Sequence, residues 1–209
     1  MSPEPRLVLA TRNQGKLREL RELLRGQVPG LDVDSQVIDA AAAGAPDVVE
    51  DGTTFEENSL KKAHAVAQHT GLVAVADDSG LSVEVLGGAP GIFSARWAGR
   101  HGDDEANLRL LLNQLADVRA EHRNAAFVCA AALATASGAE AVERGYLAGT
   151  LLTEPRGANG FGYDPILQPH GMHLSVAELD PEVKNSLSHR GQAFRQLLPE
   201  LIRVLSGGR

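Results

Sequence analysis

The most constraining stretch of this chain is an apolar run that ends in two neighbouring carboxylates. Residues 72–76 read Leu-Val-Ala-Val-Ala, which has the length and β-branching of a buried strand. Asp77 and Asp78 follow directly, and then Ser79 and Gly80. Open α/β sheets bind ligands at the carboxyl edge of their strands, where carboxylates could hold a hard divalent cation or activate a water. Because the same residue types form ordinary solvated turns, this stretch alone leaves both alternatives open.

Strand-like and helix-like patterns alternate along the chain, and this alternation predicts an α/β fold. We expect strands at 7–10, 31–34, 72–76, 81–85, 125–135 and 142–152. We expect helices from Lys16 to Gly26, from Thr54 to Gly71, across 108–115, after Asp180, and from Ser188 through Pro199 to the end. The last two strands are expected to form a hairpin, so the sheet should be mixed. Residues 40–53 are expected to form a mobile loop, 77–80 a turn, and 157–165 a glycine-rich loop.

Length and charge limit the possible functions. The 209 residues suit a single domain with a real core, of one or two lobes, whose ends at 1–5 and 207–209 should fray. The net charge of −7 argues against sequence-blind binding of nucleic acid. No run of about 18 apolar residues is present, and the first residues lack a signal layout, so we expect a cytoplasmic protein that does not engage membranes.

A candidate anion site follows the first predicted strand. Thr11, Asn13 and Lys16 stand where a helix begins, and backbone N–H groups, a hydroxyl and an ammonium at a helix N-terminus bind anions. The glycine spacing differs from that of a Walker A motif. An ordinary helix cap with a solvated lysine remains the alternative at this point.

Glu50 is the candidate metal ligand in the loop that precedes the second helix. Glu56 and Glu57 fall in the first turn of that helix, where acids complement the helix dipole and need no functional explanation. Glu50 lies before the helix, in a loop that could close over a ligand, whereas Lys62 taken alone is an ordinary surface lysine.

Two later segments suggest recognition of a planar base. Phe161 and Tyr163 alternate with glycines in a chain with only 4% aromatic residues, and an aromatic ring stacked on a base contributes about 1–3 kcal/mol. Asp164 could accept hydrogen bonds from a base edge. Arg190 carries only donors, so it could bind a carbonyl oxygen and reject an amino group. A turn pinned by a buried aromatic and a helix cap with a solvated arginine are the simpler alternatives.

Taken together and in this order, these segments resemble the inosine triphosphatase family of noncanonical purine NTP pyrophosphatases, and its bacterial branch most of all. The resemblance covers nearly the whole chain. It is carried by residues 10–16 (ATRNQGK), 54–58 (TFEEN), 76–80 (ADDSG), 87–92 (GGAPGI), 160–165 (GFGYDP) and 188–191 (SHRG).

The resemblance implies an elongated α/β fold of two lobes, with a mixed central sheet flanked by helices and the active site in the cleft between the lobes. It also implies a homodimer and an Mg2+-dependent enzyme that cleaves ITP, dITP and XTP to the monophosphate and pyrophosphate. Asp78 would be the general base and, with Glu50, a metal ligand. The implied substrate-binding residues are Thr11, Arg12, Asn13, Gln14, Gly15, Lys16, Lys62, Ser79, Phe161, Gly162, Tyr163, Asp164, Lys184, His189 and Arg190.

Within this set, Phe161 would stack on the base, and Tyr163, Asp164, His189 and Arg190 would read it. Phosphates would be held by Thr11, Asn13, Lys16, Lys62, Ser79 and Lys184. Arg12 departs from the glycine that is frequent in the family, so it adds either a phosphate contact or nothing. A pyrophosphatase for other modified nucleotides and a nucleotide sensor without hydrolysis are the alternatives, and RNA binding is disfavoured by the charge.

Overall fold

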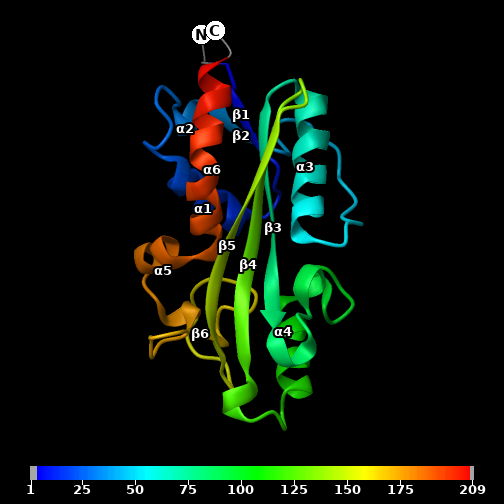
Figure 1. The fold of residues 1–209 in the computed structure, drawn as a ribbon, viewed down its shortest axis with the longest axis vertical. Helices are drawn as coiled ribbons and strands as arrows, with labels where there is room; N and C mark the ends of the chain where they lie inside the picture. The colour runs from blue at the N-terminus through cyan, green and yellow to red at the C-terminus, as the bar shows by residue number, and fades with distance from the viewer. Residues whose placement is uncertain (1–3, 208–209) are drawn as a thin grey trace. The chain divides into compact units, whose positions relative to one another are not determined.

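The computed structural model describes residues 4–207, so the predicted frayed ends lie partly outside the described residues. Figure 1 shows the helices and strands. The strands are β1 (Leu7–Leu9), β2 (Val37–Asp39), β3 (Val73–Val83), β4 (Asn124–Ala134), β5 (Glu140–Leu151) and β6 (Leu167–Pro169). The α-helices are α1 (Gln14–Leu24), α2 (Val33–Gln36), α3 (Phe55–Thr70), α4 (Asp104–Gln114), α5 (Pro181–Leu187) and α6 (His189–Ser206). Short 3₁₀ helices cover Glu84–Leu86, Gly91–Arg96, Ala120–His122 and Val176–Glu178.

The six strands form one mixed sheet in the order β2-β1-β3-β4-β5-β6. Strand β1 runs parallel to β2 and β3, whereas β5 and β6 are antiparallel. The predicted class, an α/β fold with a mixed sheet and flanking helices, is therefore confirmed. No described helix has the length and apolarity needed to cross a membrane.

The chain divides into two compact units. The first comprises Met1–Asp78, Cys129–Gly145 and Arg190–Arg209, and the second comprises Ser79–Val128 and Tyr146–His189. Strands β3, β4 and β5 each contribute residues to both units. The expected elongated shape, the cleft and the single domain stay predictions.

In the first unit, both faces of the sheet are covered by helices. Successive side chains of a strand point to opposite faces of the sheet, so Leu7 and Leu9 lie on one face and Val8 on the other. The first face packs against α1 and α6, through residues such as Leu20 and Leu197. The opposite face packs against α3, whose Ala63, Val66 and Ala67 are buried there (Figure 1). Strand β1 is thus buried on both faces.

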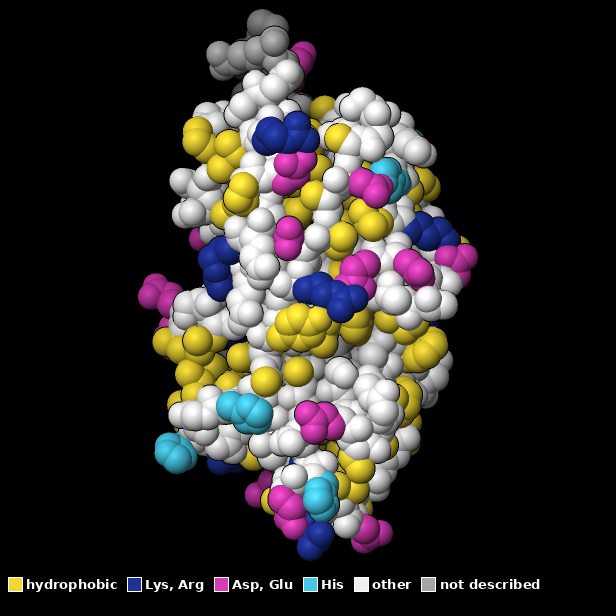
Figure 2. Space-filling view, viewed as in Figure 1, with side chains coloured by type: hydrophobic (Ala, Val, Ile, Leu, Met, Phe, Trp, Pro, Cys, Tyr) yellow, Lys and Arg dark blue, Asp and Glu magenta, His cyan; other side chains and the backbone are white. Residues whose placement is uncertain are grey.

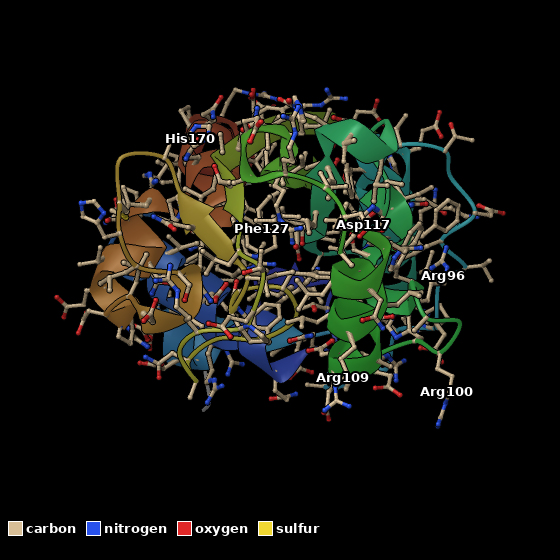
Figure 3. All side chains as sticks on the ribbon, turned by 90° about the horizontal axis from the view of Figure 1, so that it is seen from below. Arg96, Arg100, Arg109, Asp117, Phe127 and His170 are labelled. Atoms are coloured by element: carbon tan, nitrogen blue, oxygen red, sulfur yellow. The ribbon has the colours of Figure 1, made fainter. Side chains whose placement is uncertain are left out.

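The second unit has its own core. Helix α4 buries Leu108, Leu111 and Leu115 against the second half of β3 and against β4. Phe127 belongs to this core and lies inside the unit, whereas the side chains of Arg100 and Arg109 point outward (Figure 3). Separate cores explain why the chain divides into two units.

Two predictions from local sequence are wrong. Residues 77–80 do not form a turn between two strands, because β3 continues through them from Val73 to Val83. Residues 31–34 do not form an edge strand: Asp32 caps the short helix α2 by accepting from the Asp34 N–H, and the edge strand β2 follows it. In both segments, local turn or strand propensity did not predict the conformation, because propensity depends strongly on the tertiary context.

The predicted ends of α3 and the predicted start of α5 are confirmed, whereas α4 begins four residues earlier than expected, at Asp104. The Thr54 side chain accepts from Glu57 N at the start of α3, and Gly71 ends that helix with a left-handed φ of 72°. Asp180 caps α5, whose first residue is a proline. Pro199 lies inside α6, as the sequence indicated. These caps fix where α3 and α5 begin, and both helices carry candidate site residues.

Candidate active site

The neighbouring carboxylates Asp77 and Asp78 face opposite sides of the sheet. Because β3 continues through them, their side chains alternate like those of any strand. Asp77 shares a face with Val75, which packs with α1 and α6. Asp78 shares a face with Ala76, which packs with α3. Strand geometry therefore gives two adjacent carboxylates different partners and different chemistry.

Asp77 is the centre of a buried ionic network. Its Oδ2 lies 2.9 Å from Lys16 Nζ and 3.2 Å from Arg190 Nε, and its side chain is fully buried. Arg190 also pairs with Glu19 on α1. Burial alone would raise the pKa of Asp77, but Lys16 and Arg190 reverse this and hold it well below the ordinary value. Asp77 is therefore a permanent anion that positions Lys16.

Asp78 has different partners, which come from α3 and from the loop before it. Asn58 Nδ2 donates to its Oδ2 at 3.0 Å, and Lys62 Nζ lies 3.7 Å from its Oδ1. Burial raises the pKa of Asp78, and the negative charge of Glu50 adds to that effect, whereas Lys62 opposes it. A carboxylate with a raised pKa is a stronger base than an ordinary aspartate, which suits a group that activates water.

The loop before α3 brings Glu50 to the same place. Glu50 Oε1 accepts from Lys62 Nζ at 2.8 Å, so one ammonium contacts both Glu50 and Asp78. The loop is fastened by Asn58, whose Oδ1 accepts from Gly52 N at 2.8 Å. A Cβ on Gly52 would lie 2.7 Å from that Oδ1, so only glycine lets the loop approach the helix so closely.

The donor set at Glu50 and Asp78 fits a magnesium ion. Within residues 4–207, no group of three or more His, Cys, Asp or Glu side chains is arranged to hold a metal. Mg2+ in nucleotide enzymes is commonly held by only one or two carboxylates, together with waters and phosphate oxygens. Two carboxylates that converge on one ammonium provide such a pair of hard oxygen ligands.

The start of α1 carries the other candidate phosphate contacts. Thr11 Oγ1 accepts from Asn13 N at 3.2 Å, and Asn13 Oδ1 accepts from Lys16 N at 3.0 Å, so Asn13 is the N-cap. Gln14 and Gly15 form the first turn. The simple cap that the sequence left open is therefore present, and the Lys16 ammonium is held by Asp77 rather than solvated.

Arg12 binds the loop that carries Glu50. Its NH2 group donates to the Ala45 carbonyl at 2.9 Å, and its Nε lies 3.0 Å from Asp47 Oδ1. These contacts tie the turn after β1 to the segment just before Glu50. The sequence offered a phosphate contact or nothing for Arg12, and the structure adds this third role.

In the second unit, the glycine-rich loop is organised around Asp164. Its Oδ2 accepts from Phe161 N at 2.9 Å and from Lys184 Nζ at 3.0 Å. The same ammonium lies 5.1 Å from the centre of the Phe161 ring. Lys184 is thus placed with the candidate base-reading residues, although the resemblance assigned it to the phosphates.

The remaining residues of this set lie in or beside the second core. The Tyr163 hydroxyl donates to the Ser94 carbonyl at 2.9 Å, and burial raises the pKa of this phenol. The His189 ring stacks on Phe127 with centroids 5.0 Å apart. Ser79 follows Asp78 within β3. Tyr163 and His189 therefore support the loop and the start of α6 from inside.

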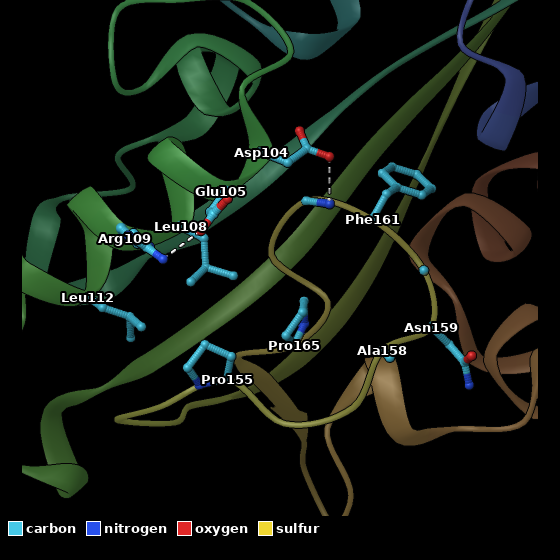
Figure 4. A pocket seen from close by; sticks show the side chains of 12 residues that line it. Asp104, Glu105, Leu108, Arg109, Leu112, Pro155, Ala158, Asn159, Phe161 and Pro165 are labelled. Atoms are coloured by element: carbon cyan, nitrogen blue, oxygen red, sulfur yellow. Dashed lines mark hydrogen bonds and ion pairs between the residues drawn. The ribbon is translucent and has the colours of Figure 1, made fainter.

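A hollow of about 600 Å³ lies between α4 and the glycine-rich loop (Figure 4). Leu108, Leu112 and Pro165 form part of its apolar wall. Asp104 Oδ2 accepts from Gly162 N at 2.9 Å, and this bond, dashed in Figure 4, joins the loop to the first turn of α4. Phe161 and its neighbouring glycines are themselves among the residues that line the hollow.

Gly160→Ala should disrupt the loop that carries Phe161. Gly160 has a φ of +80°, and a Cβ at this position would overlap the Asp164 carboxylate. For dITP, the substrate that the resemblance implies, we expect a KM that is higher by about tenfold or more, because displacement of Asp164 misplaces the ring that would stack on the base.

Gly162→Ala is the matched control for this variant, since its φ is also positive but its Cβ would meet nothing within 4 Å. Gly162→Ala should suffer only the cost of placing an alanine in a left-handed conformation, about 1–2 kcal/mol. Steady-state kinetics of both variants provide the test, and equal KM values would contradict the importance of the Gly160–Asp164 contact.

Sequence reasoning missed several residues of these clusters. Asn58 was given no role of its own from the sequence, yet it holds both Asp78 and the Glu50 loop. Glu19 and Asp104 were not singled out, because neither lies in a motif and each contacts its partner only through the tertiary fold. The spacing of Asn58 and Lys62, one helical turn apart, was the available signal for a shared face on α3.

Comparison with known proteins bears on these clusters. Residues 7–200 match the Ham1 family. The chain belongs to this family. It is 60% identical to a Streptomyces avermitilis protein named dITP/XTP pyrophosphatase, over 97% of this chain and 99% of that protein. This Ham1-family chain also resembles the structure of a HAM1 protein from Coxiella burnetii, with a TM-score of 0.84, 41% identity, and 95% and 99% coverage of the two chains.

A Mycobacterium abscessus structure, described as a nucleoside-triphosphatase and dITP/XTP pyrophosphatase, is 47% identical to this chain. It has a TM-score of 0.74, and the match covers 93% of this chain and 99% of the other. The resemblance drawn from the motifs is therefore confirmed, since relatives over nearly the full length carry the expected name. At this level of identity, the relatives show that this chain is an enzyme that hydrolyses nucleoside triphosphates.

Proposed function

We propose that this chain is an Mg2+-dependent nucleoside triphosphate pyrophosphatase that hydrolyses dITP, ITP and XTP to the monophosphate and pyrophosphate. The observation that carries the proposal is the buried Asp78 carboxylate, held by Asn58 beside Glu50 and Lys62. The relatives named dITP/XTP pyrophosphatase support the choice of substrate.

In the proposed reaction, Asp78 orients a water and accepts its proton as the water oxygen attacks the α-phosphorus. The bond from the α-phosphorus to the oxygen bridging to the β-phosphate breaks, and pyrophosphate leaves with that oxygen. Mg2+ held by Glu50, Asp78 and phosphate oxygens would neutralise developing negative charge. Lys16, Lys62 and the N–H groups at the start of α1 would hold the phosphates, together with Thr11, Asn13 and Ser79.

The loop of the second unit would recognise the base. Phe161 would stack on the purine, and Asp164 and Lys184 beside it would present an acceptor and a donor to its edge. Arg190 is proposed to donate to the 6-oxo group. A guanidinium carries only donors, so it pairs with a carbonyl oxygen and not with an amino group.

The substrate proposal is tested by pyrophosphate release with Mg2+ from dITP, ITP, XTP, dATP, dGTP and dTTP in parallel. We expect dITP, ITP and XTP to be hydrolysed at least about a hundredfold faster in kcat/KM than dATP, because the 6-amino group of adenine would face the Arg190 donors and leave both sides without an acceptor. Equal hydrolysis of all six would favour a pyrophosphatase of other specificity. No release from any would favour a nucleotide-binding module.

The remaining parts of the proposal concern partners and location. On the face shown in Figure 2, Lys and Arg side chains are scattered among acidic ones, and no broad basic surface gathers there. This supports a small-molecule substrate rather than nucleic acid. A homodimer and a cytoplasmic location are proposed with the family function, since the substrates belong to the nucleotide pool.

A further inference from the structure

Lys62 occupies the space between the two candidate metal ligands. Its Nζ lies 2.8 Å from Glu50 Oε1 and 3.7 Å from Asp78 Oδ1. The Lys62 side chain is only 13% exposed, and the carboxylates are 29% and 9% exposed. One ammonium thus contacts both carboxylates, at a place where Asp78 is nearly buried and Glu50 is partly exposed.

The two carboxylates are positioned by contacts other than those to Lys62. Strand β3 and the Asn58 amide fix Asp78, and the same Asn58 fixes the Glu50 loop through Gly52 N. Lys62 follows Asn58 by one helical turn on α3, so its ammonium reaches a pair that is already formed. Lys62 therefore contributes a positive charge to this pair of carboxylates, not their position.

Cations contact the carboxylates on both faces of β3. Lys16 and Arg190 pair with Asp77 on one face. On the α3 face, the Lys62 ammonium contacts Glu50 and Asp78, and the charge of Lys16 also acts on Asp78. An ammonium and a divalent cation cannot share the space between the two carboxylates, because two cations at that distance repel strongly at low dielectric.

We propose that Lys62 is a placeholder cation that holds the metal position in the nucleotide-free protein and moves to phosphate oxygens when a divalent ion binds. The proposal rests on the proposed function, which supplies the metal and the phosphates. A lysine suits this exchange, because its ammonium is a compact charge with three rotatable donors on a flexible stem. When the metal binds without nucleotide, it must displace the Lys62 ammonium, which then has no new anionic partner. When the metal binds together with a triphosphate, the displaced ammonium can pair with phosphate oxygens.

Removal of the ammonium should therefore strengthen metal binding in the absence of nucleotide. We would titrate the nucleotide-free protein with Mn2+, followed by electron paramagnetic resonance, for the wild type and Lys62→Met. The methionine keeps an unbranched side chain and removes the charge. We expect the Kd for Mn2+ to fall by about tenfold or more, within the range of couplings between two linked binding events.

Lys61→Met is the matched control. Lys61 is the preceding residue on the same helix and pairs with Asp51, but both side chains are largely exposed. The Lys61→Met variant loses the same charge as Lys62→Met. Because exposed charges are screened, its Kd for Mn2+ should nevertheless stay within about twofold of the wild-type value. Lys62→Gln serves as a second variant if the methionine impairs folding.

The double variant Lys62→Met/Glu50→Gln should lose the gain in affinity, which assigns the Mn2+ to this site. Unchanged or weaker Mn2+ binding in Lys62→Met and Lys62→Gln overturns the proposal, as does an equal gain in Lys61→Met. The result is independent of the substrate panel. Tighter Mn2+ binding without hydrolysis of any triphosphate would reject the proposed function and keep the placeholder cation.

Discussion

Asp78→Asn should fold normally and lose turnover of dITP by about a hundredfold or more, the scale of a lost acid–base group. The amide preserves the size of the side chain but cannot accept a proton from water. Because burial raises the pKa of Asp78, the folded state disfavours its charged form. Replacing it with a neutral side chain should therefore leave the free energy of unfolding unchanged or higher.

Two measurements check this result together. Pyrophosphate release gives kcat and KM, and urea denaturation gives the free energy of unfolding. Turnover close to that of the wild type would remove Asp78 from its role as the base. A large loss of stability would show that Asn58 and Lys62 need the carboxylate for folding, in which case lost turnover could not be assigned to chemistry.

Asp77→Asn, one residue earlier, should have the opposite effect on stability. We expect the free energy of unfolding to fall by about 3–5 kcal/mol, because Lys16 and Arg190 would be left buried without their shared anion. Activity should also fall, since Lys16 loses its positioning. Urea denaturation measures the change, and a loss below about 1 kcal/mol would contradict the network as a determinant of the fold.

The stability difference between the wild type and Asp77→Asn should decrease as the pH falls. The pKa of Asp77 is lower in the folded than in the unfolded chain, so its ionised form contributes stability above the unfolded value of about 3.9. That contribution disappears as the pH falls further toward the folded pKa. The advantage of the wild type over Asp77→Asn should therefore be full at neutral pH and shrink below about pH 4. Asp51→Asn, in an exposed pair with Lys61, should change little at any pH.

Helix boundaries and family could be predicted from the sequence because their signals are local. Thr54 and Glu57 have capping-box spacing, Gly71 supplies the left-handed end, and Asp180 precedes a proline. Each of these features needs only a few neighbouring residues. The motifs that identified the family are likewise short segments, and their order along the chain did not depend on the fold.

The partners of the charged side chains could not be predicted, because they come from distant parts of the chain. Arg190 reaches Asp77 across 113 positions of sequence. The resemblance assigned Lys184 to the phosphates, and its bond to Asp164 beside Phe161 is visible only in the fold. Arg12 was expected at the substrate or nowhere, and it holds the Glu50 loop. No local spacing encodes these choices.

The sequence by itself determined the α/β alternation, the helix caps and the two adjacent carboxylates at a buried strand. Only the tertiary structure decided that this strand continues through Asp77 and Asp78 instead of turning. Two charges can stay inside a strand because helices on both faces supply Lys16, Arg190, Asn58 and Lys62 as partners. Because side chains alternate along the strand, Asp77 becomes a structural anion on one face and Asp78 a candidate base on the other. This difference depends on the burial and the charged partners of each carboxylate, which come from the tertiary structure.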